Sequence, residues 1–130
     1  MSYNGWMLPD EERARVLAEF PPAYALIKAT HVTLSIDVKE IPQDAEIVIV
    51  GYATDQAGVE ALVVTVNGEE TRPDGKQFHL TLSVADGRAS KESNEVIMEY
   101  GWTLLETPFP IRTKGFLYGG TGYITTALSA

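Results

Sequence analysis

Hydrophobic and polar residues alternate most regularly in two six-residue stretches, HVTLSI and HLTLSV. Both follow the pattern H-apolar-T-L-S-apolar, and each begins with one of the two histidines of the chain. Alternation with a period of two is typical of a β-strand that has one apolar and one polar face. The polar faces are expected to carry His31, Thr33 and Ser35 in the first strand, and His79, Thr81 and Ser83 in the second.

Other elements are predicted from the spacing of apolar residues and from the residues that begin or end them. Helical spacing follows Pro9 and stops at Pro21 and Pro22, which predicts a helix within 8–20. The segment SKESNEVIMEY favours a second, short helix, with Ser90 or Ser93 available as its N-cap. The second histidine strand extends over 78–84, and short apolar and β-branched runs predict further strands at 2–8, 45–54, 59–66, 102–106 and 109–113.

These elements fall into two similar halves with no linker or low-complexity segment between them. Each half contains one helix, one histidine strand and neighbouring strands. We therefore expect a single domain over 1–130, with pseudo-symmetric lobes at about 1–55 and 56–112. The glycine-rich tail at 113–130 is compatible either with a last hairpin or with partial disorder. The predicted class is α+β, with a pseudo-twofold axis that brings the histidine strands together in a central groove.

Composition narrows the possible functions. A length of 130 residues with 45% hydrophobic and 22% charged residues indicates one globular domain. The absence of cysteine excludes disulfides and thiolate catalysis. A net charge of -8 argues against binding of long duplex nucleic acid, because that affinity comes mostly from Lys and Arg. No apolar run long enough to span a membrane and no signal peptide is present in the sequence, so no membrane partner and a cytoplasmic location are expected.

Two imidazoles and two threonine hydroxyls facing each other across a groove suit phosphodiester chemistry. Histidine has an ordinary pKa of about 6.5, so one neutral imidazole can accept a proton while the other, protonated, donates one. Thr33 and Thr81 can donate hydrogen bonds to the phosphate oxygens on which charge develops. This chemistry needs no metal and no other cofactor. The pattern does not assign acid and base between His31 and His79.

Several other interpretations remain open. The two strands can be relics of a duplication with a purely structural role, although structure alone would favour keeping the apolar face. A zinc site would need Asp or Glu ligands in addition to the two histidines, and neither H-E-x-x-H nor G-x-S-x-G occurs. The same groove can also serve a nucleotide-binding protein that sequesters its ligand without cleaving it.

The paired H-apolar-T-apolar strands resemble the 2H phosphoesterase superfamily. This superfamily includes LigT-like RNA cyclic phosphodiesterases, the cyclic phosphodiesterase domain of fungal tRNA ligases and phage anti-CBASS cyclic-oligonucleotide nucleases. The resemblance rests on the tetrads HVTL and HLTL and covers roughly residues 1–112. It implies a bilobal fold with antiparallel sheets lining a central groove and helices outside. It also implies that His31 and His79 are the acid and base, and that Thr33 and Thr81 orient the phosphate.

The resemblance, together with the small and acidic chain, favours a small bacterial or phage branch and a small cyclic nucleotide or oligonucleotide as substrate. A phage protein would act on such a signal in the host cytoplasm. Candidate substrate-binding residues are Tyr3, Trp6, Lys91 and Trp102, through base stacking or phosphate charge. Arg72 and Arg88 are further candidates for phosphate charge, and Asn94 is a candidate helix cap. Oligomeric state, substrate base and linkage stay open.

Overall fold

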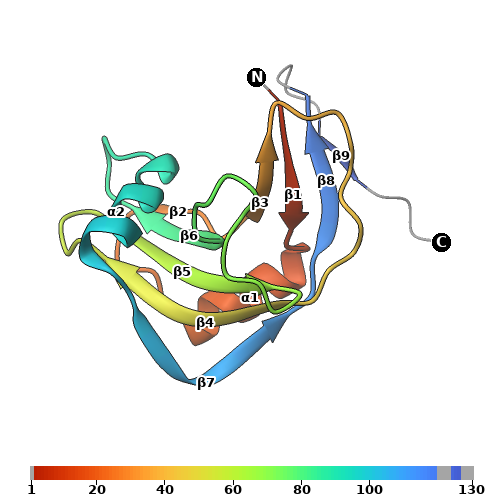
Figure 1. Ribbon diagram of the computed structural model, residues 1–130. Helices are drawn as coiled ribbons and strands as arrows, with labels where there is room; N and C mark the ends of the chain where they lie inside the picture. The colour runs from red at the N-terminus through yellow and green to blue at the C-terminus, as the bar shows by residue number, and fades with distance from the viewer. Residues whose placement is uncertain (1, 120–123, 127–130) are drawn as a thin grey trace.

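The computed structural model describes residues 2–119 and 124–126, and these residues form one sheet of nine strands with two α-helices (Figure 1). The strands are β1 (Tyr3–Met7), β2 (Leu26–Ile27), β3 (His31–Ile36), β4 (Ile47–Thr54), β5 (Val59–Val66), β6 (His79–Val84), β7 (Thr103–Ile111), β8 (Lys114–Tyr118) and β9 (Ile124–Thr126). The helices are α1 (Asp10–Glu19) and α2 (Ser93–Tyr100), the latter preceded by the 3-10 turn η1 (Ser90–Glu92). The predicted α+β class is confirmed.

The strand order is β7-β4-β5-β6-β3-β1-β8-β9, with β2 beside β6, and neighbouring strands are antiparallel. In Figure 1, β3, β1 and β8 run upright on the right, while β6, β5, β4 and β7 sweep across the lower left. The two groups join between β3 and β6, where Val32 pairs with Leu80.

Neither group of strands coincides with one of the two halves expected from the sequence. Strand β4, from the expected first lobe, pairs with β5 and β7. Strand β8, from the expected tail, pairs with β1. Part of the tail is therefore a strand of the sheet, and β8 and β9 form an antiparallel pair. Residues 120–123 and 127–130 of the tail lie outside the described residues.

The sheet is covered on two faces, because alternate residues of a strand point to opposite sides. On one face, Leu62 and Val64 of β5 belong to the main core together with Val16 of α1. On the other face, Ala61 and Val63 pack with Ile97 of α2. Neither helix in the described part of the chain has the length and apolar character needed to cross a lipid bilayer.

Each histidine strand contains a β-bulge one residue after its threonine. The register of β1 with β3 shifts at Leu34, and that of β5 with β6 shifts at the equivalent Leu82. An additional residue reverses the alternation of faces, so Ser35 and Ser83 turn away from the histidine–threonine face. The prediction that each serine shares this face is therefore wrong. Ser83 is buried on the opposite side of the sheet.

Two local predictions differ from the structure. Segments 102–106 and 109–113 were expected as separate strands, but β7 is one strand that contains Pro108 and Pro110. Strand β7 lies at the edge of the sheet, where a residue without an N–H group is tolerated. No serine side chain caps the helical segment: the N-cap positions of η1 and α2 are Ala89 and Glu92. Ser93 instead directs its hydroxyl to Thr81.

Candidate active site

The two histidine strands meet at the middle of the sheet and run in opposite directions. Because Val32 lies opposite Leu80, the antiparallel register sets His31 beside Thr81 and Thr33 beside His79. All four side chains line one cavity of about 440 Å³. This volume falls within the range of about 300–1,000 Å³ that is usual for ligand pockets. The structure thus brings the four predicted residues into a single site.

His79 is held in one tautomer by the backbone. Its Nδ1 lies 3.0 Å from the carbonyl oxygen of Gln77. A carbonyl only accepts, so Nδ1 carries a hydrogen and Nε2 is left to exchange protons with a ligand. Burial lowers the pKa of His79, the hydrogen bond to Gln77 opposes this shift, and the positive charges of Arg72 and Lys76 lower the pKa further.

His31 lies in an aromatic environment. Its ring centroid is 5.5 Å from that of Tyr3 and 5.4 Å from that of Phe116, and its Nδ1 is 2.9 Å from the hydroxyl of Thr30. Burial lowers the pKa of His31 to about 4, with a further contribution from His79. Both imidazoles line the same cavity, so one ligand in that cavity can lie against both rings.

The two threonines differ in their surroundings. Thr81 is 8% exposed, and its hydroxyl is 2.9 Å from that of Ser93 and 3.3 Å from the carbonyl oxygen of Ser90. Thr33 is half-buried, and its hydroxyl has no hydrogen-bond partner among the residues that the structure describes. Its hydroxyl is therefore available to a ligand.

Three lysines line the same cavity, although the chain as a whole is acidic. They are Lys28, Lys76 and Lys91, and none of them takes part in an ion pair within the described residues. Lys91 was predicted, whereas Lys28 and Lys76 were missed. The signal was present in the sequence, because each of these two lysines precedes a histidine by three residues. The repeated phrase is therefore K-x-x-H-apolar-T-L-S-apolar.

The two candidate arginines have partners within the chain. Arg72 lines the cavity but is 5% exposed, and its guanidinium binds both carboxylate oxygens of Asp74. Arg88 donates to Asp55 and Glu92 and does not line the cavity. The charge of Arg72 is therefore balanced by Asp74 at the wall of the cavity, while Arg88 ties the turn before β5 to η1.

The four predicted substrate-binding residues separate into different places. Tyr3 and Lys91 line the cavity with the histidines. Trp6 is 4% exposed in the core, and its indole N–H donates to the carbonyl oxygen of Gln43 at 2.9 Å. Tyr3 and Trp6 are an odd number of residues apart in one strand, so they face opposite sides of the sheet. Trp102 lines an adjoining cavity.

Asn94 lies at the boundary between these two cavities and lines both. It is not the N-cap of α2. Its Nδ2 donates to the carbonyl oxygen of Lys91 at 3.4 Å, and its buried Oδ1 has no partner within the described part of the chain. Asn94 therefore offers a hydrogen-bond acceptor to a ligand that carries a donor.

Within residues 2–119 and 124–126, no group of three or more His, Asp or Glu side chains is arranged to hold a metal ion. Comparison of the chain with models of protein families, with curated proteins and with solved structures gave no match.

Proposed function

We propose that the protein is a phosphodiesterase of the 2H phosphoesterase type, with a bilobal pseudo-twofold fold and two-histidine acid/base catalysis that requires no metal ion. One observation carries the proposal: His31 and Thr33 lie opposite Thr81 and His79 on paired antiparallel strands, and all four line one cavity. The equivalent bulges at Leu34 and Leu82 support a pseudo-twofold relation between the strands.

In the proposed reaction, a phosphodiester lies between the two imidazoles. One imidazole takes the proton of the attacking 2′-hydroxyl or water, and the oxygen of that group forms a bond to phosphorus. The bond from phosphorus to the leaving oxygen breaks, and the other imidazole, as imidazolium, gives that oxygen its proton. Thr33 and Thr81 donate to the non-bridging oxygens as negative charge develops on them.

The low pKa values set a condition on this mechanism. Burial lowers the pKa of both histidines, that of His31 to about 4, so His31 is neutral in the free protein at pH 7. A bound phosphate anion favours the imidazolium, because an opposite charge a few ångströms away raises a histidine pKa. Substrate binding therefore raises the pKa of one histidine, so that it takes up a proton and becomes the acid that is absent from the free protein.

Charge and size favour a small substrate. The lysines around the cavity attract a phosphate locally, whereas the net charge of -8 opposes a long polyanion. We propose a small cyclic nucleotide or cyclic oligonucleotide, with either a 2′,3′-cyclic phosphate or a 3′,5′ linkage, as the substrate class.

The test is to incubate the protein in EDTA with a panel of 2′,3′-cyclic nucleotides and 3′,5′-linked cyclic dinucleotides and to quantify the products. We expect turnover with a bell-shaped pH profile, and a loss on the order of 10²–10⁴-fold in His31→Ala and in His79→Ala. Tyr100→Ala, an exposed substitution on α2, is the control. Wild-type turnover in both histidine variants would contradict the proposal.

Sequestration of a nucleotide without turnover is the second candidate function. The observation in its favour is that Lys28, Lys76 and Lys91 line the cavity, because these cations can bind a phosphate without any proton transfer. Tight binding of a cyclic nucleotide with no product at any pH between 5 and 8 would favour this function over catalysis.

A further inference from the structure

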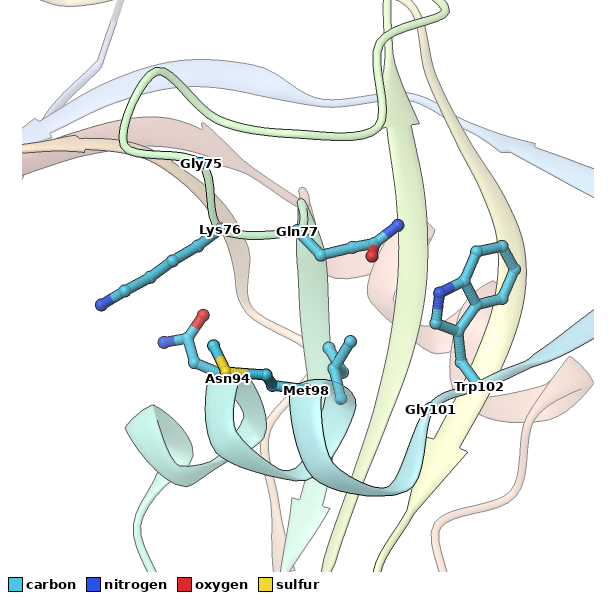
Figure 2. A pocket seen from close by; sticks show the side chains of 8 residues that line it. Gly75, Lys76, Gln77, Asn94, Met98, Gly101 and Trp102 are labelled. Carbon is cyan, nitrogen blue, oxygen red and sulfur yellow. The ribbon is translucent and has the colours of Figure 1, made fainter.

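A second cavity of about 320 Å³, here named the α2 cavity, adjoins the candidate active site. Figure 2 shows it between the loop at 75–77, helix α2 and the indole of Trp102. Lys76 and Asn94 line both cavities, so the two spaces meet at these side chains. We propose that the α2 cavity binds the nucleobase of a nucleotide whose phosphate lies between the histidines, an inference that rests on the proposed function.

The histidine cavity is lined by cations and the α2 cavity mostly by uncharged residues, which matches the anionic phosphate and the neutral base of a nucleotide. The histidine cavity is lined by three lysines that form no ion pair within the described residues, Lys28, Lys76 and Lys91, whereas the charge of Arg72 is paired with Asp74. In the α2 cavity Lys76, at the shared boundary, is the one charged residue of the described lining. A phosphate is therefore favoured in the first cavity and a neutral, partly apolar ring in the second.

The apolar wall of the α2 cavity is a fixed aromatic ring. Trp102 packs directly on β4, where a Cβ at Gly51 would lie 2.1 Å from its Cε3. Glycine at position 51 thus leaves the space that the indole occupies. Ile97, 6% exposed, and Met98, 77% exposed, also line this cavity. An aromatic side chain of this kind binds a base by stacking.

Polar groups that suit the edge of a base lie around this apolar surface. The buried Oδ1 of Asn94 lacks a partner among the described residues, and a buried acceptor without a hydrogen bond is unfavourable. An N–H group of a base would satisfy it. Figure 2 shows the amide of Gln77 reaching from the opposite side of the cavity toward Trp102. Stacking and hydrogen bonding are therefore both available within one cavity.

Tryptophan fluorescence can test this inference without relying on turnover. The chain has two tryptophans: Trp6 lies in the core, and Trp102 lines the α2 cavity. The probes are adenosine 2′-monophosphate and uridine 2′-monophosphate, compared with ribose 5-phosphate. We expect at least one nucleotide to quench the fluorescence and to bind at least tenfold more tightly than ribose 5-phosphate. Trp102→Phe should abolish the quenching.

Asn94→Ala is the decisive variant, and calorimetry gives its affinities. We expect it to weaken nucleotide binding by at least fivefold and to leave the affinity for ribose 5-phosphate unchanged. The control, Tyr100→Ala, lies on the same helix outside both cavities and should bind like the wild type. Equal affinities for nucleotide and ribose 5-phosphate, or equal losses for both in Asn94→Ala, would overturn the base-binding inference alone. The proposed catalysis fails separately, if His31→Ala and His79→Ala keep their turnover.

Discussion

The hydroxyl oxygens of Thr81 and Ser93 lie 2.9 Å apart, whereas the equivalent Thr33 has no such partner among the described residues. The candidate site is therefore asymmetric although its two strands are alike. Either hydroxyl can donate in this pair. When Ser93 donates, the hydrogen of Thr81 is free to point to the carbonyl oxygen of Ser90 at 3.3 Å or, in the proposed reaction, to a phosphate oxygen. Helix α2 thus reaches the proposed chemistry through Ser93.

Ser93→Ala should lower kcat about tenfold with little change in KM, because the hydrogen bond that orients Thr81 matters most as negative charge develops on the phosphate. The pH profile should not move, since neither imidazole contacts Ser93. Steady-state kinetics over pH 5–9 measures both quantities. Ser35→Ala, whose side chain the bulge turns away from the cavity, is the control. Wild-type kcat in Ser93→Ala would show that Thr81 is oriented without it.

Stability should depend on pH through His31. Its pKa is lowered from 6.5 to about 4 in the folded chain, so the unfolded chain binds a proton at pH 5 that the folded chain does not. This contribution to stability is complete above pH 6.5 and is lost as the pH falls toward 4. Between pH 7.5 and pH 5 the loss is about 2 kcal/mol.

The measurement is urea unfolding of the wild type and of His31→Asn at pH 7.5 and at pH 5. The variant has no titratable group at this position, so it should lose about 2 kcal/mol less than the wild type over this interval. Above pH 5 most carboxylates keep their charge, which leaves the histidines as the main titrating groups. Identical losses in the two proteins would mean that His31 is not shielded from solvent.

Lys28 should contribute to phosphate binding through its charge. Lys28→Gln removes one cation from the wall of the cavity and should raise KM for an anionic substrate about three- to tenfold at low salt. The difference should shrink at 0.5 M NaCl, because salt screens the interaction. Lys39→Gln, an exposed residue outside the cavity, is the matched control. An equal rise of KM in both variants would indicate an effect of net charge rather than of position.

Local sequence patterns predicted the individual helices and strands better than they predicted which strands pair in the sheet. Alternation predicted the histidine strands, and prolines predicted both ends of α1. The pairing of β8 with β1 joins the two ends of the chain, and no short segment of sequence carries that information. The bulges were missed because a leucine occupies the additional position in each strand, where simple alternation also expects an apolar residue.

Alternation within a single strand shows which of its side chains share a face, and this part of the site could be predicted from the sequence. This placed His31 with Thr33 and His79 with Thr81. Asn94 and Ser93 come from α2, which packs on the strands through long-range contacts, and the sequence offered only a capping role for them. Lys28 and Lys76 were within reach of prediction, since they belong to the repeat, but they precede the alternating part of it.

Glu60 should be one of the residues on which the stability of the histidine strand β6 depends. It is 1% exposed, and its carboxylate accepts hydrogen bonds from the Ala23 N–H, the Ser83 hydroxyl and the Tyr52 hydroxyl. No cation pairs with it within the described residues. Burial and the neighbouring carboxylate both raise the pKa of Tyr52, so the phenol remains a donor at neutral pH.

Glu60→Ala leaves three donors without their acceptor and opens a cavity, which should cost at least about 3 kcal/mol. Tyr52→Phe removes a single hydrogen bond to a charged group and should cost about 1.5–3 kcal/mol. Urea unfolding at pH 7.5 measures both as shifts in midpoint with an unchanged slope. Glu106→Ala, exposed on β7, is the control and should leave the midpoint unchanged.

Glu60→Ala should also lower the activity of protein that remains folded. Glu60 holds Ser83, and Ser83 lies two residues after Thr81 in β6, so loss of this contact should displace Thr81 in the candidate site. A midpoint unchanged in Glu60→Ala would contradict the assignment of its carboxylate as the buried acceptor of this strand.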